Sequence, residues 1–289
     1  MKFLNVLVFS TIGSVADAFS LRMQQGNPSY RSTSIPLSSV DYDTREASTG
    51  SPYLSSLGDN ENKPTQEIFE DIDQVTVQGG SLRTCSFAES VCRVGVFLKT
   101  GGRPLNANID LWQGPDNTPQ KMTVYLEDGS KRPFRAIVET PGSSNAVSIR
   151  NTAQLEYPLV AGMDLDMSGT SNPPSVSTDY RIVQGGAVYT LPFAPAVQSI
   201  RVSLKTDGRP LNARVELLQG PNNNKQVMEV YTEDGLERPF NVIVDAPGVG
   251  NVVRIVNTAT VEFPLSAALE PFIIDESRID SAGPGMTWR

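Results

Sequence analysis

The sequence predicts an all-β fold with two tandem, homologous antiparallel domains that resemble β-sandwiches, preceded by a disordered N-terminal targeting and linker region. Three observations support this prediction. Apolar and polar residues alternate in short runs, which is typical of half-buried strands. Gly, Pro and Asn separate these runs at roughly ten-residue spacing, as in sandwiches and barrels. The whole pattern also occurs twice within 289 residues, which indicates two domains of ordinary size.

The repeat keeps its register over long motifs. The first copy contains Leu-Lys-Thr-Gly-Gly-Arg-Pro-Leu-Asn-Ala (98–107), and the second contains Leu-Lys-Thr-Asp-Gly-Arg-Pro-Leu-Asn-Ala (204–213), an offset of 106 residues. The same offset relates two Gln-Gly-Pro, two Glu-Asp-Gly and two Arg-Pro-Phe motifs. The two domains are therefore expected at residues 75–162 and 180–268, with a linker at 163–179.

Alternation places the expected strands within each copy. In the first copy they cover 93–99, 109–112, 121–126, 134–139, 146–151 and 154–158, with equivalents in the second copy. The motifs between them are predicted to be turns. Gly102 and Gly208 should supply a positive φ before Arg-Pro, and Gly129 in Glu-Asp-Gly is expected in left-handed geometry as well.

The first 40 residues are predicted to be a targeting region. Residues 1–18 combine a positive start, an apolar run and a small-x-small site, which is typical of a signal peptide. Residues 19–40 begin with Phe19 and contain arginine and serine but no acid, which is typical of a plastid transit peptide. Plastid delivery is favoured, with secretion as the alternative. No membrane span is expected in the mature protein, because the apolar run is too short.

Two further segments flank the expected domains. Residues 41–74 are polar and acidic and are predicted to be disordered, apart from a candidate amphipathic helix at 64–72 with Ile68, Phe69 and Ile72 on one face. Residues 269–289 form a tail. Its apolar start favours a strand, and a strand outside a completed domain needs a partner surface.

The composition argues against catalysis and against nucleic-acid binding. The chain has no His, which removes the commonest general base and metal ligand, and its formal charge is −8. The adjacent carboxylates Glu127 and Asp128 point to opposite faces of a strand and lack calcium-loop spacing. Cys85 and Cys92 have no counterparts in the second copy, so they are expected to be thiols, with a local bridge as the alternative. No catalytic, cofactor-binding or metal-binding residue is predicted.

Duplication favours assembly. Two like domains present two like surfaces, and a contact between unlike patches of neighbouring molecules propagates instead of closing. The apolar tail could add a strand to a neighbour's open edge. Charged positions that differ between the copies could favour pairing of unlike copies. The candidate assembly contacts are Phe272, Ile273, Ile274, Arg135, Arg150 and Arg254.

The retained polar residues at the turns allow a different interpretation. Arg103, Asn106 and Arg132, with their second-copy counterparts, are expected to bond backbone carbonyls and fix the loops. If they contacted a ligand instead, the chain would be a tandem, lectin-like binding module without catalysis.

The doubled Lys-Thr-x-Gly-Arg-Pro-Leu-Asn-Ala and Glu-Asp-Gly-x-x-Arg-Pro-Phe units resemble the pyrenoid shell proteins of diatoms, the PyShell family, over residues 78–264. The two-part presequence likewise resembles that of diatom plastid proteins. This resemblance implies a non-enzymatic structural protein of the plastid stroma, at the pyrenoid periphery. It implies assembly into a sheet around the Rubisco matrix, in support of CO2 concentration and fixation. The implied partners are further copies of the chain, related shell proteins and the Rubisco matrix.

Overall fold

The computed structural model describes residues 63–142, 144–166, 179–221, 223–275 and 277. Within this part, one α-helix, α2 (Thr65–Asp71), precedes a long series of strands. The predicted signal peptide, the transit-like segment and most of the acidic linker lie outside the described residues. So do 167–178, in the predicted linker between the copies, and 278–289, in the predicted tail.

The strands form two matching sets. The first repeat contains β1 (Gln74–Val77), β2 (Leu82–Ser86), β3 (Arg93–Lys99), β4 (Leu105–Gln113), β5 (Asn117–Leu126), β6 (Phe134–Glu139), β7 (Asn145–Asn151) and β8 (Leu159–Asp166). The second repeat contains β9 (Arg181–Val183), β10 (Val188–Pro192), β11 (Val197–Lys205), β12 (Leu211–Gln219), β13 (Asn224–Thr232), β14 (Phe240–Asp245), β15 (Asn251–Asn257) and β16 (Leu265–Ile274). The 106-residue offset relates β6 to β14 and β7 to β15 residue for residue.

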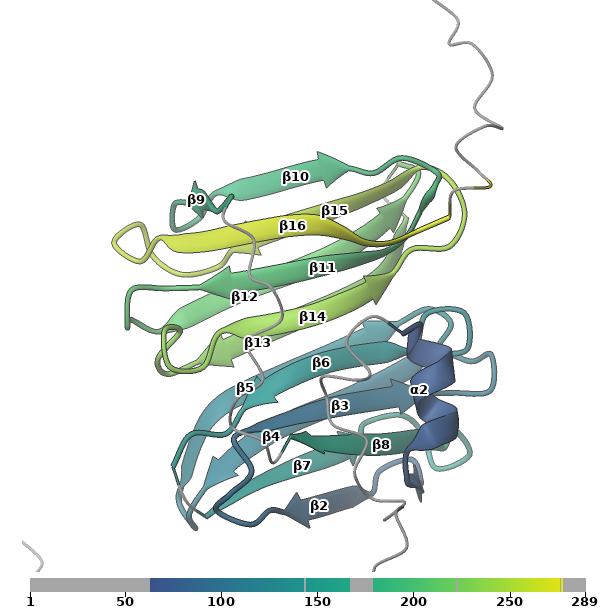
Figure 1. Cartoon of the computed structure of the whole chain (residues 1–289), viewed down its shortest axis with the longest axis vertical. Helices are drawn as coiled ribbons and strands as arrows, with labels where there is room; N and C mark the ends of the chain where they lie inside the picture. The colour runs from purple at the N-terminus through teal and green to yellow at the C-terminus, as the bar shows by residue number, and fades with distance from the viewer. Residues whose placement is uncertain (1–62, 143, 167–178, 222, 276, 278–289) are drawn as a thin grey trace, which may run out of the picture. The chain divides into compact units, whose positions relative to one another are not determined.

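These strands build two antiparallel sheets that both run through both repeats (Figure 1). Sheet A has the order β1-β8-β3-β6-β14-β11-β16-β9, and sheet B has the order β10-β15-β12-β13-β5-β4-β7-β2. Buried side chains of both sheets and of both repeats belong to one hydrophobic cluster. The two repeats therefore share their sheets and their core, a continuity that the division of the sequence into two domains did not include.

Burial follows the alternation that predicted the strands. Along β4, Leu105, Ala107, Ile109 and Leu111 are buried, while the residues between them are partly exposed. Strand β3 departs from this pattern and is buried on both faces. The reason is α2, which lies across this part of sheet A and packs Ile68 and Phe69 against Phe97 (Figure 1). The predicted helix is thus confirmed, and residues 65–71 are not disordered.

Most predicted strands are confirmed, and the one at 154–158 is wrong. That segment is a turn, closed by a hydrogen bond from the Tyr157 N–H to the carbonyl of Gln154. The strand follows it as β8, which begins after Pro158, a residue without an N–H to donate to a ladder. Because β8 continues to Asp166, sheet A extends past the expected end of the first domain at residue 162.

The prediction of a separate apolar tail is also wrong for its first residues. Strand β16 continues to Ile274 and pairs with β11 over most of its length. An irregularity in register between Val197 and Ile200 accommodates the last residues. The end of β16 therefore belongs to sheet A of this chain and includes Phe272, Ile273 and Ile274. Its pairing satisfies backbone groups along β11 that would otherwise form an open edge.

Glycine has two different roles in the turns. Gly102 and Gly208 have φ of 78° and 100°, as predicted. Gly129 is not in the left-handed region; it is needed for space, since a Cβ there would meet the side chain of Thr100. Gly79 and Gly185 are the tightest cases of this second kind, because a Cβ would overlap the carbonyl oxygen of Gln154 or of Thr260.

We expect Gly79→Ala to lower the free energy of unfolding by about 1–3 kcal/mol or more, the usual cost of overpacking. The new Cβ would meet the backbone of Gln154, which cannot move aside as a flexible side chain can. Urea unfolding would measure this. Gly101→Ala is the matched control: a Cβ there meets nothing, and the second repeat already has Asp207 at this position. The control should change stability by no more than ~0.5 kcal/mol. Equal effects of the two substitutions would contradict the explanation.

Candidate assembly surfaces

The two repeats join each other through one strand pairing in each sheet. Strand β5 pairs with β13 in sheet B, and β6 pairs with β14 in sheet A. In the first pairing Thr123 lies opposite Glu229, and in the second Ala136 lies opposite Val242. Each of these pairs consists of equivalent residues in the two repeats, offset by 106 positions. The joint therefore has two-fold backbone symmetry, like the isologous interface of a homodimer.

Side chains repeat this symmetry. The Arg132 guanidinium donates from Nη2 to Oε1 of Gln219 at 3.0 Å, and Arg238 donates from Nη2 to Oε1 of Gln113 at 3.1 Å. Both arginines are buried. Burial lowers the pKa of the Arg132 guanidinium, and the carboxylates of Glu127 and Asp128 oppose that shift. Each repeat thus gives one arginine and one glutamine to the joint.

The backbone and the ends of the strands add to the joint in the same reciprocal way. The Glu127 N–H donates to the carbonyl of Lys225 at 2.9 Å, and the Glu233 N–H donates to the carbonyl of Pro119 at 2.8 Å. An ion pair of 2.6 Å between Lys225 Nζ and Glu127 Oε2 occurs on one side.

These contacts correct the expected role of the retained arginines. Arg132 and Arg238 were expected to bond nearby backbone carbonyls, whereas the structure pairs them with side chains of the other repeat. The expectation holds for Arg209, which donates to the Glu262 carbonyl at 2.7 Å. Arg103 instead lies over the ring of Tyr157, 5.0 Å from its centroid. A local sequence pattern could not show the cross-repeat pairs, because 87 residues separate Arg132 from Gln219.

Arg135, a predicted assembly contact, is used inside the chain. Only 2% of its surface is exposed. It donates from Nη1 to the Lys63 carbonyl at 2.9 Å and lies over the rings of Phe97 and Phe272. Its prediction as a surface contact is therefore wrong. Arg135 ties the start of α2 and the first repeat to the last strand of the second repeat.

Asp245 lies beside this cluster, at the end of β14. It accepts a hydrogen bond of 2.7 Å from Ser199 Oγ. Burial raises the pKa of the Asp245 carboxyl, although the bond from Ser199 and the positive charge of Arg135 favour its ionised form. Burial therefore favours the protonated form of Asp245.

The other predicted contacts have mixed positions. Phe272 and Ile273 are half-buried, and 50% of Ile274 is exposed. Arg150 is exposed on β7. Arg254 on β15 is partly exposed and pairs with the buried carboxylate of Glu216. Arg150 and Ile274 are thus available to a second molecule, whereas Arg254 already has an internal partner.

Four short strands form the outer edges of the two sheets. The first repeat ends in β1 and β2, and the second repeat ends in the equivalent strands β9 and β10. Each edge exposes an apolar side chain: Val75 on β1, Leu82 on β2, Ile182 on β9 and Val188 on β10. The molecule therefore has equivalent ends, as the joint symmetry requires.

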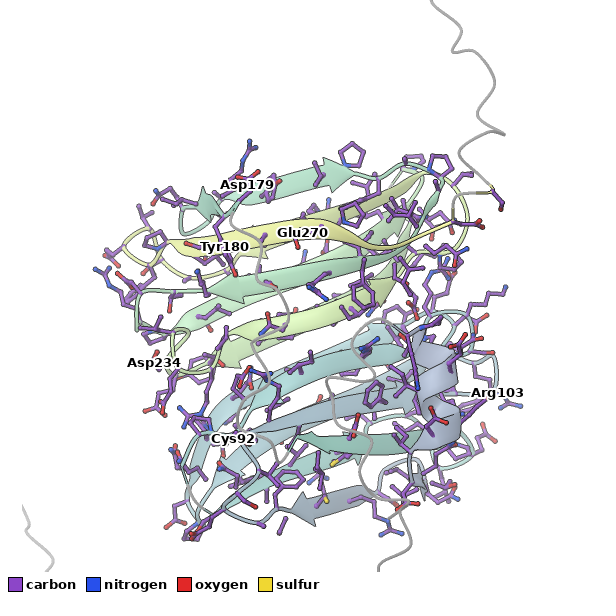
Figure 2. All side chains as sticks on the ribbon, in the orientation of Figure 1. Cys92, Arg103, Asp179, Tyr180, Asp234 and Glu270 are labelled. Atoms are coloured by element: carbon purple, nitrogen blue, oxygen red, sulfur yellow. The ribbon has the colours of Figure 1, made fainter. Side chains whose placement is uncertain are left out.

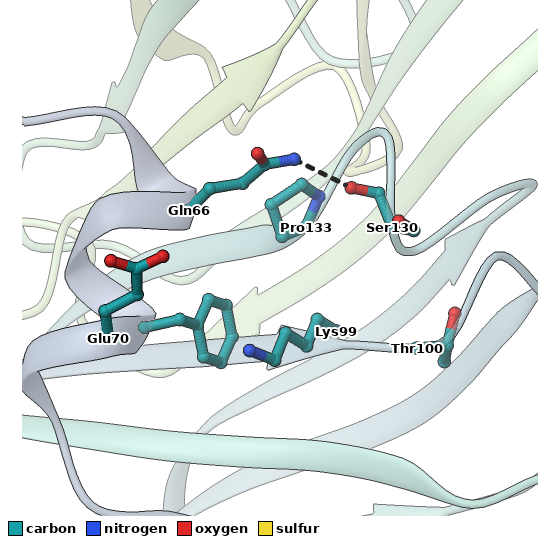
Figure 3. Close-up of a pocket in the computed structure, with 7 residues that line it drawn as sticks. Gln66, Glu70, Lys99, Thr100, Ser130 and Pro133 are labelled. Carbon is teal, nitrogen blue, oxygen red and sulfur yellow. Dashed lines mark hydrogen bonds between the residues drawn. The ribbon is translucent and has the colours of Figure 1, made fainter.

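A shallow hollow of about 280 Å³ lies between α2 and the turns of the first repeat (Figure 3). Gln66 on α2 donates to the Ser130 carbonyl at 3.0 Å, and Lys99 Nζ lies 4.3 Å from the centre of the Phe69 ring. Lys205, the equivalent of Lys99, lies 3.9 Å from the ring centre of Tyr180. Both retained lysines therefore have the structural role of holding a preceding segment on sheet A.

Cys85 and Cys92 are free thiols, Cys92 is exposed (Figure 2), and burial raises the pKa of the Cys85 thiol. Among the residues that the structure describes, no group of three or more His, Cys, Asp or Glu side chains is placed to hold a metal ion. The helical part of the described chain contains no segment of the length and apolarity needed to cross a membrane.

We expect Arg132→Met and Arg238→Met each to lower the free energy of unfolding by about 1.5–3 kcal/mol, because each removes a hydrogen bond from a charged donor and leaves a glutamine oxygen unpaired. Urea unfolding would test this. Arg83→Met, at an exposed position on β2, is the control and should cost no more than ~0.5 kcal/mol. A large loss at only one of the two joint arginines would contradict the symmetric joint.

We expect the free energy of unfolding of the Asp245→Asn variant to increase, relative to that of the wild-type chain, as the pH rises from about 4 to 7. The pKa of Asp245 is higher in the folded protein than in the unfolded chain, where it is near 3.9. The wild-type chain therefore loses stability, relative to a neutral side chain, as the pH rises through the folded pKa. Urea unfolding at several pH values would measure the difference. A difference that shrinks with rising pH would show that Arg135 outweighs burial.

Comparison with solved structures gives only distant likenesses. A triple jelly roll protein from the turret of an archaeal virus shares 9% identity and a TM-score of 0.22, over 66% of this chain and 62% of that one. An oxalate decarboxylase mutant of Bacillus subtilis shares 9% identity and a TM-score of 0.19, over 73% and 72%. Pumpkin pro-11S globulin shares 9% identity and a TM-score of 0.18, over 70% and 77%. Likenesses this distant carry no conclusion about function.

Family membership rests on sequence. No curated protein matches the chain. The model of the family described as diatom pyrenoid shell protein matches residues 67–271, a range that begins within α2 and ends within β16. This range includes both repeats and the joint between them. The chain belongs to the diatom pyrenoid shell protein family.

Proposed function

We propose that this protein is a self-assembling unit of a protein sheet that encloses the Rubisco matrix of the plastid pyrenoid and supports CO2 concentration and fixation there. Family membership supports the class, a structural shell protein, and the proposal is that it acts without catalysis. The observation that carries the assembly proposal is the two-fold joint inside the chain.

The joint is important for assembly because it places inside one chain the two-fold contact that two separate copies would otherwise make with each other. In an ordinary homodimer, a two-fold contact between like surfaces ends the assembly. Here that contact lies within one polypeptide, and the equivalent outer ends of the two repeats are left for other molecules. A contact between the first repeat of one molecule and the second repeat of the next then continues without closing.

Several modest contacts acting together would hold such a sheet. Surface contacts that are individually weak gain strength when one molecule makes several of them at once. Some of the predicted contacts are still accessible to a neighbour: Arg150, Ile274 and the half-buried pair Phe272 and Ile273. Each repeat would act as one sandwich-like half of the unit.

The proposed partners are further copies of the chain, related shell proteins and the Rubisco matrix. The proposed location is the plastid stroma at the pyrenoid periphery, with residues 1–40 as the segment that directs delivery.

We expect the purified chain, tested with and without residues 1–40, to form sheets or tubes that are visible by electron microscopy. A chain that stays monomeric at high concentration would contradict the proposal. A monomer that binds a glycan specifically and saturably would favour the lectin-like alternative. In the cell of origin, a fluorescent fusion should label a hollow rim around the pyrenoid, and a diffuse or secreted signal would contradict the location.

A further inference from the structure

Both repeats present an apolar side chain at the tip of the same loop. Leu155 lies in the loop between β7 and β8, and Val261 lies at the equivalent position between β15 and β16. Their exposed fractions are 77% and 74%, the highest among the exposed large apolar residues of the described chain. We call these two residues the loop tips.

The loops that carry the tips are held rigidly by the fold. In the first repeat, Asn151 Nδ2 donates to the carbonyls of Val77 at 2.9 Å and of Tyr157 at 2.8 Å, and Asn151 Oδ1 accepts from the Ala153 N–H. The backbone of Gly79 lies so close to the loop that no Cβ would fit.

The second repeat builds its loop with the same set of contacts. Asn257 Nδ2 donates to the carbonyls of Val183 at 3.0 Å and of Phe263 at 2.9 Å, and Gly185 lies against Thr260 as Gly79 lies against Gln154. The backbone at each tip is therefore held in place, and a preorganised loop loses little conformational entropy when a partner buries its side chain.

The fold itself does not explain an apolar residue at the tips. A side chain that is three-quarters exposed adds almost nothing to the core, and water would accommodate a polar residue there better. Leu236, in the turn between β13 and β14, shows the contrast. It is 64% exposed, and its counterpart in the first repeat is Ser130. An apolar residue is retained in both repeats at the tips and in only one repeat at that turn.

The charges beside the tips differ between the repeats. In the first repeat, Arg103 lies over the ring of Tyr157 and has no acidic partner among the described residues. In the second repeat, Asp207 replaces Gly101 and lies 3.5 Å from the Nε of Arg209. The first tip therefore carries the more positive surroundings and the second the more negative, which favours contact between unlike tips.

Residues near the two tips lie on opposite sides of the described structure. Figure 2 labels Arg103 at one margin and Asp234 at the other. Arg103 and Gln154 line one hollow, beside Leu155. The Gly235 N–H, next to Asp234, donates to the Arg209 carbonyl, and Arg209 bonds Glu262, beside Val261. Tips beside these residues can engage two different neighbours.

The open sheet edges are a weaker explanation for assembly. Strands β1 and β9 have four and three residues, and the edges include Arg83 and Arg181. Short strands with charged side chains are the usual means by which proteins protect an edge from pairing with another chain.

We propose that the Leu155 tip of one molecule packs against the Val261 tip of the next, with Arg103 facing Asp207. The partner is a second copy of this chain, and the inference rests on the proposed self-assembly. Because the contact joins unlike surfaces, each molecule offers one of each and the contact propagates in a line.

The first test replaces each tip with a charged residue. Leu155→Glu and Val261→Glu should each raise the protein concentration needed for sheets or tubes by about tenfold or more, since a buried aliphatic contact is lost. Light scattering and electron microscopy would measure this. Val249→Glu is the control, because Val249 is 65% exposed and lies in the turn before β15, at the opposite end of that strand from Val261; it should leave that concentration unchanged. All three variants should unfold at the wild-type urea concentration, because the three side chains are exposed.

The second test concerns the pairing of unlike tips. Arg103→Glu should weaken assembly, and adding Asp207→Arg to the same chain should restore it. In a Cys85→Ser, Cys92→Ser background, Leu155→Cys mixed with Val261→Cys should form disulfide-linked heterodimers, at several times the yield of either variant alone. Linked homodimers of Leu155→Cys at equal yield would overturn the pairing of unlike tips.

The outcomes separate this inference from the proposed function. If the wild-type chain forms sheets and both tip variants form them at the same concentration, the tip contact is wrong and self-assembly stands. If the wild-type chain stays monomeric, both are wrong.

Discussion

The structure depends on the backbone pairing of β5 with β13 and of β6 with β14. Without it, these four strands would be open edges, with rows of N–H and C=O groups that lack partners. Pairing satisfies those groups and merges the buried side chains of both repeats into one cluster. Arg132 and Arg238 then add a polar contact on either side of the two-fold axis, because each buried guanidinium finds a glutamine oxygen on the other repeat.

This constraint explains why the two copies have kept the same motifs. Gln-Gly-Pro and Arg-Pro-Phe are turn and strand-start sequences, but their glutamine and arginine also hold the opposite repeat. A change in one copy would therefore leave an unpaired buried group in the other, which is costly. The tightly packed glycines act within a single copy. Gly79 and Gly185 keep the loop that follows β7 or β15 close to the turn that precedes β2 or β10. The motifs are thus kept in both repeats for two reasons: packing within each repeat and contacts between the repeats.

The sequence predicted what depends on local pattern and missed what depends on pairing across the chain. Alternation located β3 and β6 to the residue, and the amphipathic spacing of Ile68, Phe69 and Ile72 located α2. The predicted strand at 154–158 failed because β propensity was weighed without the turn that ends at Pro158. The apolar start of the tail was assigned to a neighbouring molecule because nothing local shows that β11 has a free edge. Arg135 was assigned to the surface because charge alone does not reveal a position between two aromatic rings.

Departures from symmetry matter as much as the symmetry. The backbone of the joint treats the two repeats alike, yet their surfaces differ: α2 covers sheet A over the first repeat, and Asp207 stands where the first repeat has Gly101. If the two repeats were identical, contacts between like surfaces and contacts between unlike surfaces would be equally favourable. A charge present on one repeat and absent from the other favours contact between unlike ends. A two-fold backbone with unlike surfaces is therefore compatible with the end-to-end assembly that we propose.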